Sequence, residues 1–340
     1  MQRRRRTALA IRATATTGVS DFNTMSAVPQ PPGVAMTDFL RGDPHPWQSG
    51  TLDRDRLYAA ANQLASHPAH LDAARRLAGA VLAILDRSPL ARRVMHDAPM
   101  YLMLVCCMAL EHRRRTRGGE GVTLQALRAL MHRGDAPRLA GDSHLRDMMG
   151  WARLCGLLER DTGEGLADRR MRRYRPTPAL EAIFSEWIAD FTAAIAPVLA
   201  PPWRGAGPTL PEVYAVLSLR IEAYTHDGFV AVERHPMVHR FMLRRHGYHV
   251  FLALLEGMRS TPHGAESPLS LSALSHRFRV ARGTIRPVIE MAEAAQLLSF
   301  DREAGLARLS PAFVALARAW MALEMTWMHG VCAAVVRSSR

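Results

Sequence analysis

The sequence predicts a mainly α-helical protein made of two homologous units, and three observations lead to this fold class. Residues 89 to 128 recur without gaps at residues 236 to 275, which is 147 positions later. Apolar residues recur every three to four positions through most of the chain, as in amphipathic helices. Short strand-like stretches flank a Gly-containing turn near the end of each unit and predict a hairpin. Because an internal repeat of this length defines the unit of structure, we expect two units of about 130 residues each.

The repeat continues toward the C-terminus with a shorter spacing. Its three blocks, separated by 147, 140 and 133 residues, include the pairs Pro89 with Pro236, Tyr101 with Tyr248, Leu145 with Ile285, Pro178 with Pro311, and Trp187 with Trp320. Each drop in spacing is an insertion in the first copy or a deletion in the second. The drops fall in the turn before a helix and in the hairpin, which are surface segments that vary without disturbing a core.

Length and composition describe a globular chain with a strong positive charge. A chain of 340 residues with 48% apolar content is long enough for two cores. Its longest apolar run, residues 100 to 110, is about half the length that spans a bilayer, so no transmembrane segment is expected. The net charge of +13 and the pI near 10.8 favour an anionic partner, either nucleic acid or an acidic membrane surface.

All basic residues except histidine are arginine, and the sequence contains no lysine. Codon bias in a GC-rich genome is the simplest explanation. The physical consequence is that planar guanidinium groups, which suit phosphates and guanine edges, supply the positive charge. The absence of lysine excludes Schiff-base and P-loop chemistry. No catalytic motif occurs at a recognisable spacing, so we expect a protein that is not an enzyme and needs no cofactor or metal.

Four segments are expected along the chain. Residues 1–51 form a disordered or irregular extension, 52–198 the first unit, 199–211 a Pro- and Gly-rich linker, and 212–336 the second unit. The extension is rich in arginine and has no signal-peptide pattern; an organelle transit peptide, a DNA-grasping arm and a misassigned start remain alternatives. Four cysteines without a CxxC pair favour a reducing compartment.

Each unit is expected to follow the same order of elements. Helical patterns begin at residues 52, 70 and 99 in the first unit and at 211, 235 and 247 in the second. Hairpin strands are expected at 157–161 with 171–175, and at 297–301 with 307–310, followed by long helices from Pro178 and Pro311. Two short helices, a hairpin and a long helix in this order are typical of a winged helix-turn-helix. The sequence therefore predicts two homologous winged helix-turn-helix units with flanking helices.

The second unit presents the clearer DNA-recognition helix. Its first helix points Leu271 and Leu274 inward, the chain turns at residues 279–282, and Thr284 is expected to cap a second helix with Pro287 in its first turn. One apolar stripe runs along this helix, formed by Ile285, Val288, Ile289, Ala292 and Ala295. Short polar and arginine side chains are left at the exposed N-terminal end, where a recognition helix meets base edges.

The first unit repeats this arrangement with a more basic hairpin. Asp142 or Ser143 is expected to cap the helix, and Gly156 to end it. The seven extra residues before this helix leave a degenerate recognition site as an alternative. Five arginines of the hairpin, which would add salt-sensitive affinity for any sequence, are Arg169, Arg170, Arg172, Arg173 and Arg175. An ordinary solvated face is the alternative for them.

The segment LSALSHRFRVARGTIRPVIEMAEAAQLL resembles the winged-helix region of bacterial regulators of the MarR and GntR types, and the order of the flanking helices resembles the MarR plan. Arg279 stands where that turn usually has Gly, and Ala281 where Ser usually caps. The resemblance implies a transcriptional regulator in which two MarR-like units form a single-chain pseudo-dimer. It also implies duplex DNA as the partner, with a small-molecule effector and further homodimerisation as possibilities. Two unequal units favour an asymmetric DNA site.

Residues from both units are expected to contact DNA. They are Arg277, Arg279, Arg282, Thr284 and Arg286 in the second unit, and Ser143, His144, Arg146, Arg169, Arg170, Arg172 and Arg173 in the first. A plasmid-type replication initiator and a protein-interaction scaffold that does not bind DNA are the alternatives to a regulator. A nucleoid-associated, cytoplasmic location follows from the DNA-binding interpretation.

Two clusters of potentially reactive residues have structural interpretations. Cys106 and Cys107 correspond to Ala253 and Leu254 in the second unit, so we expect inert core residues. His235 and His239, with His246 and His249 nearby, have a spacing that can hold a metal. Their first-unit counterparts are not ligands, and we expect surface or hydrogen-bonded histidines.

Overall fold

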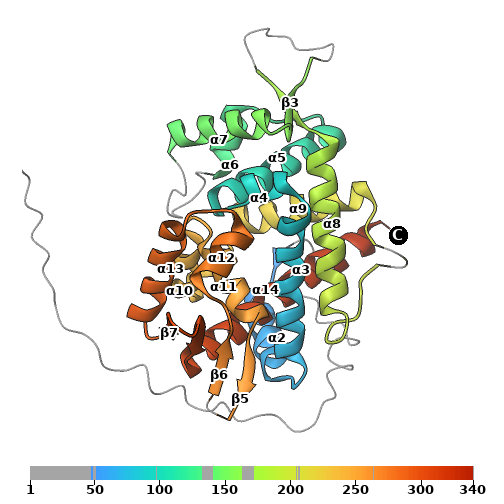
Figure 1. Cartoon of the computed structure of the whole chain (residues 1–340). Helices are drawn as coiled ribbons and strands as arrows, with labels where there is room; N and C mark the ends of the chain where they lie inside the picture. The colour runs from blue at the N-terminus through green and yellow to red at the C-terminus, as the bar shows by residue number, and fades with distance from the viewer. Residues whose placement is uncertain are drawn as a thin grey trace, which may run out of the picture. The chain divides into compact units, whose positions relative to one another are not determined.

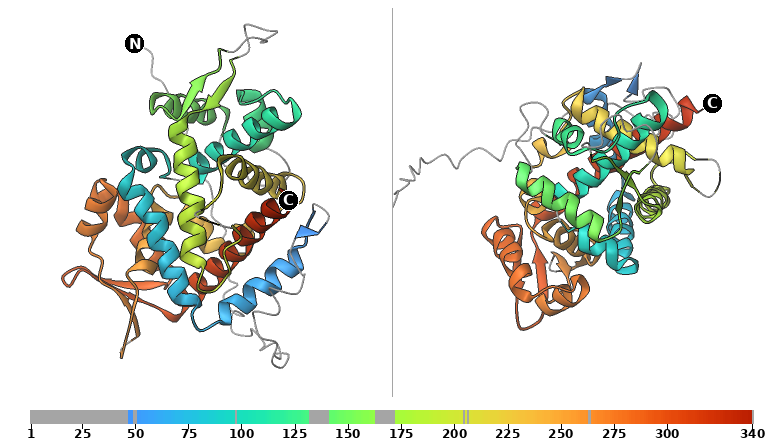
Figure 2. Two further views of the ribbon diagram at one scale, coloured as in Figure 1. Left: turned by 90° about the vertical axis from the view of Figure 1, so that its right-hand side faces the viewer. Right: turned by 90° about the horizontal axis from the view of Figure 1, so that it is seen from above.

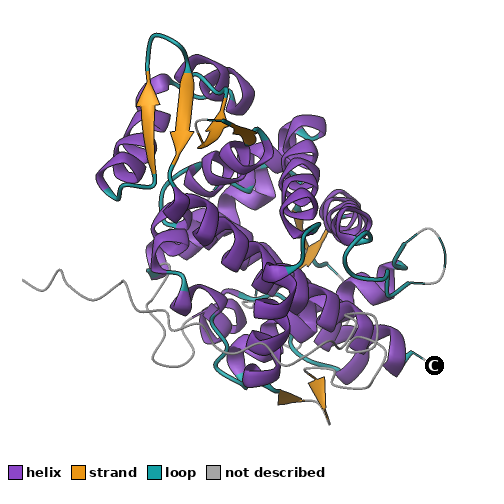
Figure 3. Ribbon diagram, turned by 90° about the horizontal axis from the view of Figure 1, so that it is seen from below, coloured by secondary structure: helices purple, strands orange, loops and turns teal. Residues whose placement is uncertain are grey.

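The computed structural model describes residues 47–48, 51–96, 98–131, 141–162, 172–203, 205, 207–262 and 264–339. Residues 1–46, which make up most of the predicted N-terminal extension, lie outside these ranges. In the described part the protein is mainly helical, with small antiparallel sheets (Figures 1 and 3). The predicted mainly α class is confirmed.

The elements are named here in chain order. The helices of the N-terminal half are α2 (Arg54–Ser66), α3 (His70–Arg87), α4 (Pro89–Val94), α5 (Ala98–Arg117), α6 (Leu124–Met131), α7 (Asp142–Leu154) and α8 (Pro178–Ile195). Those of the C-terminal half are α9 (Leu210–Thr225), the 3₁₀ helix η1 (Ala231–Arg234), α10 (Pro236–Met242), α11 (Gly247–Glu256), α12 (Leu271–Phe278), α13 (Arg282–Ala294) and α14 (Pro311–Ser338). The strands are β1 (Trp47–Gln48), β2 (Thr51–Leu52), β3 (Leu158–Arg160), β4 (Tyr174–Pro176), β5 (Arg259–Thr261), β6 (Gly264–Ser267), β7 (Leu298–Asp301) and β8 (Leu306–Leu309).

The helices begin where local chemistry supplies partners for their free N–H groups. The Asp53 side chain accepts from the Arg56 N–H at the start of α2, and Ser310 accepts from Phe313 N–H at the start of α14. Pro178 and Pro311 open α8 and α14, where a missing N–H leaves no hydrogen bond unmade. The long helices predicted from these prolines are confirmed.

The two halves pack against each other reciprocally. Helix α5 of the first half packs on α9 of the second, and α11 of the second packs on α3 of the first. Two further contacts between the halves also correspond to each other: α8 packs on α9, and α14 packs on α3. Inside each half, the corresponding contacts are α3 with α8 and α9 with α14. Figure 2 shows α8 running alongside α3 from the β3–β4 hairpin. Each half therefore completes the helical core of the other.

Equivalent aromatic pairs occupy the two halves of this core. The rings of Tyr101 and Trp187 meet edge to face with centroids 6.0 Å apart, and those of Tyr248 and Trp320 do so at 6.4 Å. Tyr101 and Tyr248 lie 147 residues apart in the sequence, and the two tryptophans 133. The repeated residues thus make the same contact twice, as expected for equivalent positions in two copies.

A four-stranded antiparallel sheet in the second half contains a hairpin that sequence analysis missed. Its order is β5-β6-β8-β7, and the predicted strands correspond to β7 and β8. The helical pattern from residue 247 was expected to reach residue 260, but α11 ends at Glu256 and the chain enters β5. A Cβ atom on Gly257 would lie 2.7 Å from the Ser267 hydroxyl oxygen of β6, so any other residue here would need that hydroxyl to move. Pro262 and Gly264 were the overlooked turn signal.

The starts of the predicted recognition helices differ from expectation. Helix α13 begins at Arg282 with Ala281 as N-cap, so Thr284 does not cap it and Pro287 lies inside the helix rather than in the first turn. The Thr284 N–H donates to the Ala281 carbonyl instead. In the first half, Gly141 is the N-cap of α7 and neither Asp142 nor Ser143 caps it. Extended backbone at both N-caps starts the helix without a capping side chain.

The end of helix α7 follows the prediction. Gly156 has a φ of +71° after α7, and Leu157 N–H returns to the Ala152 carbonyl at 2.9 Å. In the second half Gln296 takes the same place with a φ of +56°, and Leu297 N–H returns to Ala292. The conformation is therefore kept although glycine is not.

Helix α14 is long and apolar enough to cross a membrane by composition, and 67% of its apolar window is buried inside the protein. It packs on α2, α9 and α3, and its buried face includes Trp320, Met325 and Val331. Its apolarity is therefore explained by its place in the core.

Replacement of Arg279 by glycine is expected to stabilise the protein by about 1 kcal/mol, because this exposed residue has a left-handed φ of +54°. Urea unfolding measures the change. Arg286→Gly is the control: it removes another exposed arginine from a normal helical position and should lower stability. A loss of stability in Arg279→Gly would contradict the prediction.

His70 predicts a loss of stability in acid. It is fully buried, neither ring nitrogen has a partner among the described residues, and burial, with Arg318 and His67 nearby, lowers its pKa to about 4. The unfolded chain binds the proton more readily, so stability is complete above pH 6.5 and falls between pH 6.5 and 4 by about 2 to 3 kcal/mol. Urea unfolding at pH 7 and pH 4 tests this, and His70→Leu should remove that part of the slope. An unchanged slope in the variant would contradict it.

Candidate nucleic-acid interface and ligand cavity

The second-half helix pair presents an exposed arginine cluster. Arg279, at the turn after α12, and Arg282 and Arg286, at the N-terminal end of α13, are exposed, and Thr284 is half-buried. The turn is closed by the Ser275 hydroxyl, which donates to the Val280 carbonyl. The expected apolar stripe from Ile285 to Ala292 is buried, so the helix is held by one face while its arginines face solvent.

Arg277, also expected to contact DNA, has a structural role instead. Its guanidinium donates to Glu256 of α11 and lies 3.1 Å from an Asp86 carboxylate oxygen on α3, with 25% of the side chain exposed. It therefore joins α12 to both halves of the helical core. A half-buried arginine with two carboxylate partners is poorly placed for phosphate, and we omit it from the interface.

The corresponding helix of the first half also presents polar residues. Ser143, His144 and Arg146 are exposed on the first turns of α7. Arg128 of α6 pairs with Asp142 at 2.9 Å and ties the two helices together at this end. Figure 1 places α7 beside the β3–β4 hairpin, and Arg146 lines a groove together with Arg172 of the hairpin.

The hairpin arginines divide into paired and unpaired groups. Arg173 lies 2.6 Å from Asp161 and is largely buried, so the expectation that it contacts DNA is not carried further. Arg175 pairs with Glu159 at 2.7 Å. Arg169 and Arg170 lie outside the described residues. Arg172 is exposed and has no carboxylate partner in the described part of the chain.

Three arginines converge on a surface groove between α7 and β4. Arg146, Arg153 and Arg172 line it together with Thr123 and Tyr174, around a volume of about 450 Å³. The Arg153 guanidinium lies 5.2 Å from the centroid of the Tyr174 ring. The residues lining the groove include no acid. This arrangement suits a phosphate group.

The groove is specific to the first half. At the sequence spacings of the repeat, Glu293 stands at the place of Arg153 and Gly305 at that of Arg172, while Arg286 matches Arg146. Glu293 accepts a hydrogen bond from Phe300 N–H and fixes strand β7. Sequence analysis missed Arg153, although its place seven residues after Arg146 put both on one side of α7.

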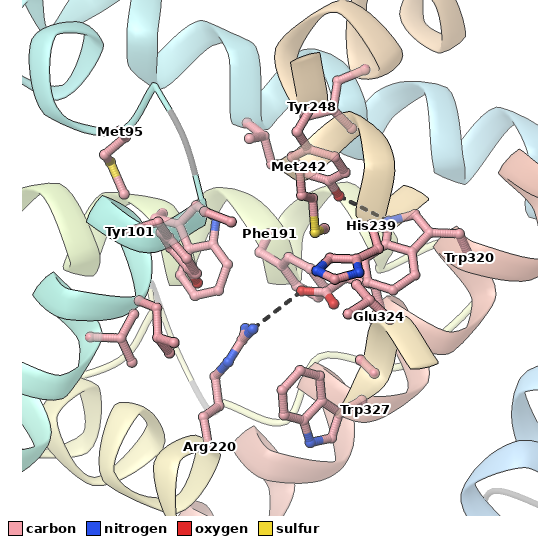
Figure 4. A pocket seen from close by; sticks show the side chains of 18 of the residues that line it. Met95, Tyr101, Phe191, Arg220, His239, Met242, Tyr248, Trp320, Glu324 and Trp327 are labelled. Carbon is pink, nitrogen blue, oxygen red and sulfur yellow. Dashed lines mark hydrogen bonds and ion pairs between the residues drawn. The ribbon is translucent and has the colours of Figure 1, made fainter. Parts of the chain in front are cut away.

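A separate cavity of about 350 Å³ lies between the two halves (Figure 4). Helices α3, α5 and α8 of the first half and α9, α10, α11 and α14 of the second all line it. Its walls are mostly aromatic and aliphatic, and include Tyr101, Trp187, Phe191, Tyr248, Trp320 and Trp327. Nothing in the sequence predicted the cavity, because its walls come from segments up to 250 residues apart.

One buried ion pair reaches into this cavity. Arg220 of α9 lies 3.5 Å from a Glu324 carboxylate oxygen on α14, and the side chains are 9% and 13% exposed. The guanidinium also lies 4.3 Å from the centroid of the Trp327 ring and 5.2 Å from that of Trp187. Burial alone lowers the Arg220 pKa, but Tyr101 and Glu324 outweigh it, so the net pKa is raised and the charge is held.

The two equivalent tyrosines of the cavity differ in their hydrogen bonds. Tyr248 Oη accepts from Trp320 Nε1 at 3.0 Å (Figure 4). Tyr101 Oη is buried and has no hydrogen-bond partner among the described residues. Burial raises the Tyr101 pKa to about 12, so its hydroxyl is protonated at neutral pH and can donate. Glu324 matches Phe191 in the repeat, so the ion pair also belongs to one half alone.

The other potentially reactive residues are structural or buried. Cys106 and Cys107 are 1% and 0% exposed, which confirms that they are core residues, and burial raises the Cys106 pKa to about 12. His246 and His249 are buried with their Nδ1 atoms 3.4 Å apart, and His235 packs on Trp320. The described residues contain no group of three or more His, Cys, Asp and Glu side chains placed to hold a metal ion.

Comparison with known proteins finds no match to this chain among protein-family models, curated proteins or solved structures.

Proposed function

We propose that this protein is a sequence-specific DNA-binding transcriptional regulator in which two fused winged-helix units act as a single-chain pseudo-dimer. The observation that carries this proposal is the repeated helix pair, α6–α7 and α12–α13. In each pair the second helix has a buried apolar stripe and exposed arginine at its N-terminal end, and an antiparallel hairpin follows it. A net charge of +13 supplies the long-range attraction for DNA.

The exposed arginines divide by the contact each can make. Arg282 and Arg286 stand on an exposed helix end that a major groove admits, where guanidinium reads guanine edges. Arg146, Arg153 and Arg172 surround a groove suited to one backbone phosphate. The second half therefore supplies base contacts, and the first half supplies more of the affinity that is independent of sequence.

The differences between the two halves favour an asymmetric DNA site. A homodimer with identical halves binds a palindrome, whereas here Glu293 and Gly305 replace two of the groove arginines. The protein would act as a binding protein in the bacterial cytoplasm, on the nucleoid. The cavity between the halves is the candidate place for a small-molecule effector.

Selection of sequences from random duplex DNA with the full chain supplies the target for two tests. Arg286→Ala should weaken binding to the selected site by about 1 to 3 kcal/mol and relax preference at one base pair. Arg337→Ala, which removes the same charge from the exposed last turn of α14, is the matched control and should leave base preference intact. Absence of any retention of DNA by the wild-type chain at low salt would overturn the proposal in favour of a protein-interaction scaffold.

The groove arginines should control the salt dependence of binding. Arg172→Ala is expected to weaken binding to all sequences alike and reduce the slope of log K against log salt by about one. Arg153→Glu, which introduces the residue of the second half, should reduce it at least as much. Arg175→Ala is the control from the same hairpin, because Arg175 is already paired with Glu159 and should change the slope less. Equal slopes in all three variants would exclude the groove from the interface.

A further inference from the structure

The cavity between the two halves has the size and walls of a small-molecule site. Protein interiors leave few voids larger than a water molecule, and a volume of about 350 Å³ lies in the range of ligand pockets. Aromatic rings from both halves line it, so a flat apolar body can stack inside (Figure 4).

Two buried polar atoms of residues that line the cavity, Tyr101 Oη and Trp327 Nε1, have no hydrogen-bond partner among the described residues. Tyr101 Oη is buried, lines the cavity and makes no hydrogen bond within the described part of the chain. A buried hydroxyl without a partner is costly, and such groups are normally satisfied. The equivalent Tyr248 Oη accepts from Trp320 Nε1, whereas Tyr101 Oη has no partner of either kind among the described residues. The Tyr101 O–H can donate to an oxygen acceptor on a bound molecule.

The charges in the cavity argue against an anionic ligand. Arg220 is the buried cation, and Glu324 already neutralises it at 3.5 Å. A ligand carboxylate would leave an uncompensated negative charge beside Glu324 in a poorly solvated site. A carbonyl oxygen can accept from Tyr101 without this penalty.

We propose that the cavity binds one uncharged, flat aromatic molecule per chain, with a carbonyl-type oxygen that accepts a hydrogen bond from Tyr101. The ligand stacks between aromatic residues of both halves. The hydrogen bond to Tyr101 orients the oxygen end of the ligand. Binding of this ligand does not depend on the binding of DNA.

Three probes of one shape test the proposal on the full chain without DNA. They are 2-acetylnaphthalene, which has a carbonyl acceptor, 2-ethylnaphthalene, which has none, and naphthalene-2-carboxylate, which is charged. Titration calorimetry, with tryptophan fluorescence as a second signal, measures affinity and stoichiometry. We expect one ketone per chain, bound about fivefold tighter than the hydrocarbon, and a weaker carboxylate.

Two matched variants locate the hydrogen bond. Tyr101→Phe removes only the unpartnered hydroxyl and should abolish the preference for the ketone while hydrocarbon binding persists. Tyr248→Phe removes the equivalent hydroxyl, which accepts from Trp320 Nε1, and should keep that preference; circular dichroism verifies that both variants fold. The proposal is overturned if no probe binds, if the carboxylate binds most tightly, or if the ketone preference survives Tyr101→Phe. None of these outcomes bears on DNA binding, which the experiments above test separately.

Discussion

The whole structure depends on burial of apolar surface between the two halves. Helix α5 is covered by α9 and α11 by α3, so the helices that each half would need for its own core are supplied by the other. The hydrophobic contribution of such burial is proportional to the area removed from water and is the main favourable term in folding. Arg277 adds a polar link at the same place, because it joins α12 to Glu256 and to Asp86 of the other half. The positions of both exposed helices, α7 and α13, follow from this shared core.

Small departures from symmetry inside the shared core create its functional features. Glu324 replaces the Phe191 of the first copy, and with Arg220 it places a neutral ion pair in an aromatic cavity. Tyr101 and Tyr248 keep the same ring contact, yet among the described residues only the Tyr248 oxygen has a hydrogen-bond partner. On the surface, Arg153 and Glu293 occupy matching places with opposite charge. The apolar core positions of the two halves still correspond, whereas the polar residues at equivalent positions differ.

Features set by neighbouring residues or by the repeat could be predicted from the sequence, whereas features set by contacts between distant segments could not. The helices from Pro178 and Pro311, the turn at Gly156 and the burial of Cys106 and Cys107 all depend on neighbours in the sequence or on the repeat. The β5–β6 hairpin was missed because the apolar helical pattern of α11 was extended past Glu256, where the helix ends. Arg277 was predicted to contact DNA like its exposed neighbours, because its ion pair with Asp86 joins positions far apart in the sequence. The cavity could not be predicted from the sequence, because residues of several helices line it together.

The joining of both halves in one chain has a consequence for assembly. A two-chain dimer with this reciprocal packing would separate on dilution, because its folded state depends on protomer concentration. Here a short connection joins α8 to α9 in one chain, so the second half is always present at a high effective concentration. Folding of the shared core is therefore first order and insensitive to how few copies a cell contains. The two halves are also inherited together, so a substitution in one is never copied into the other, and each half can be tuned alone.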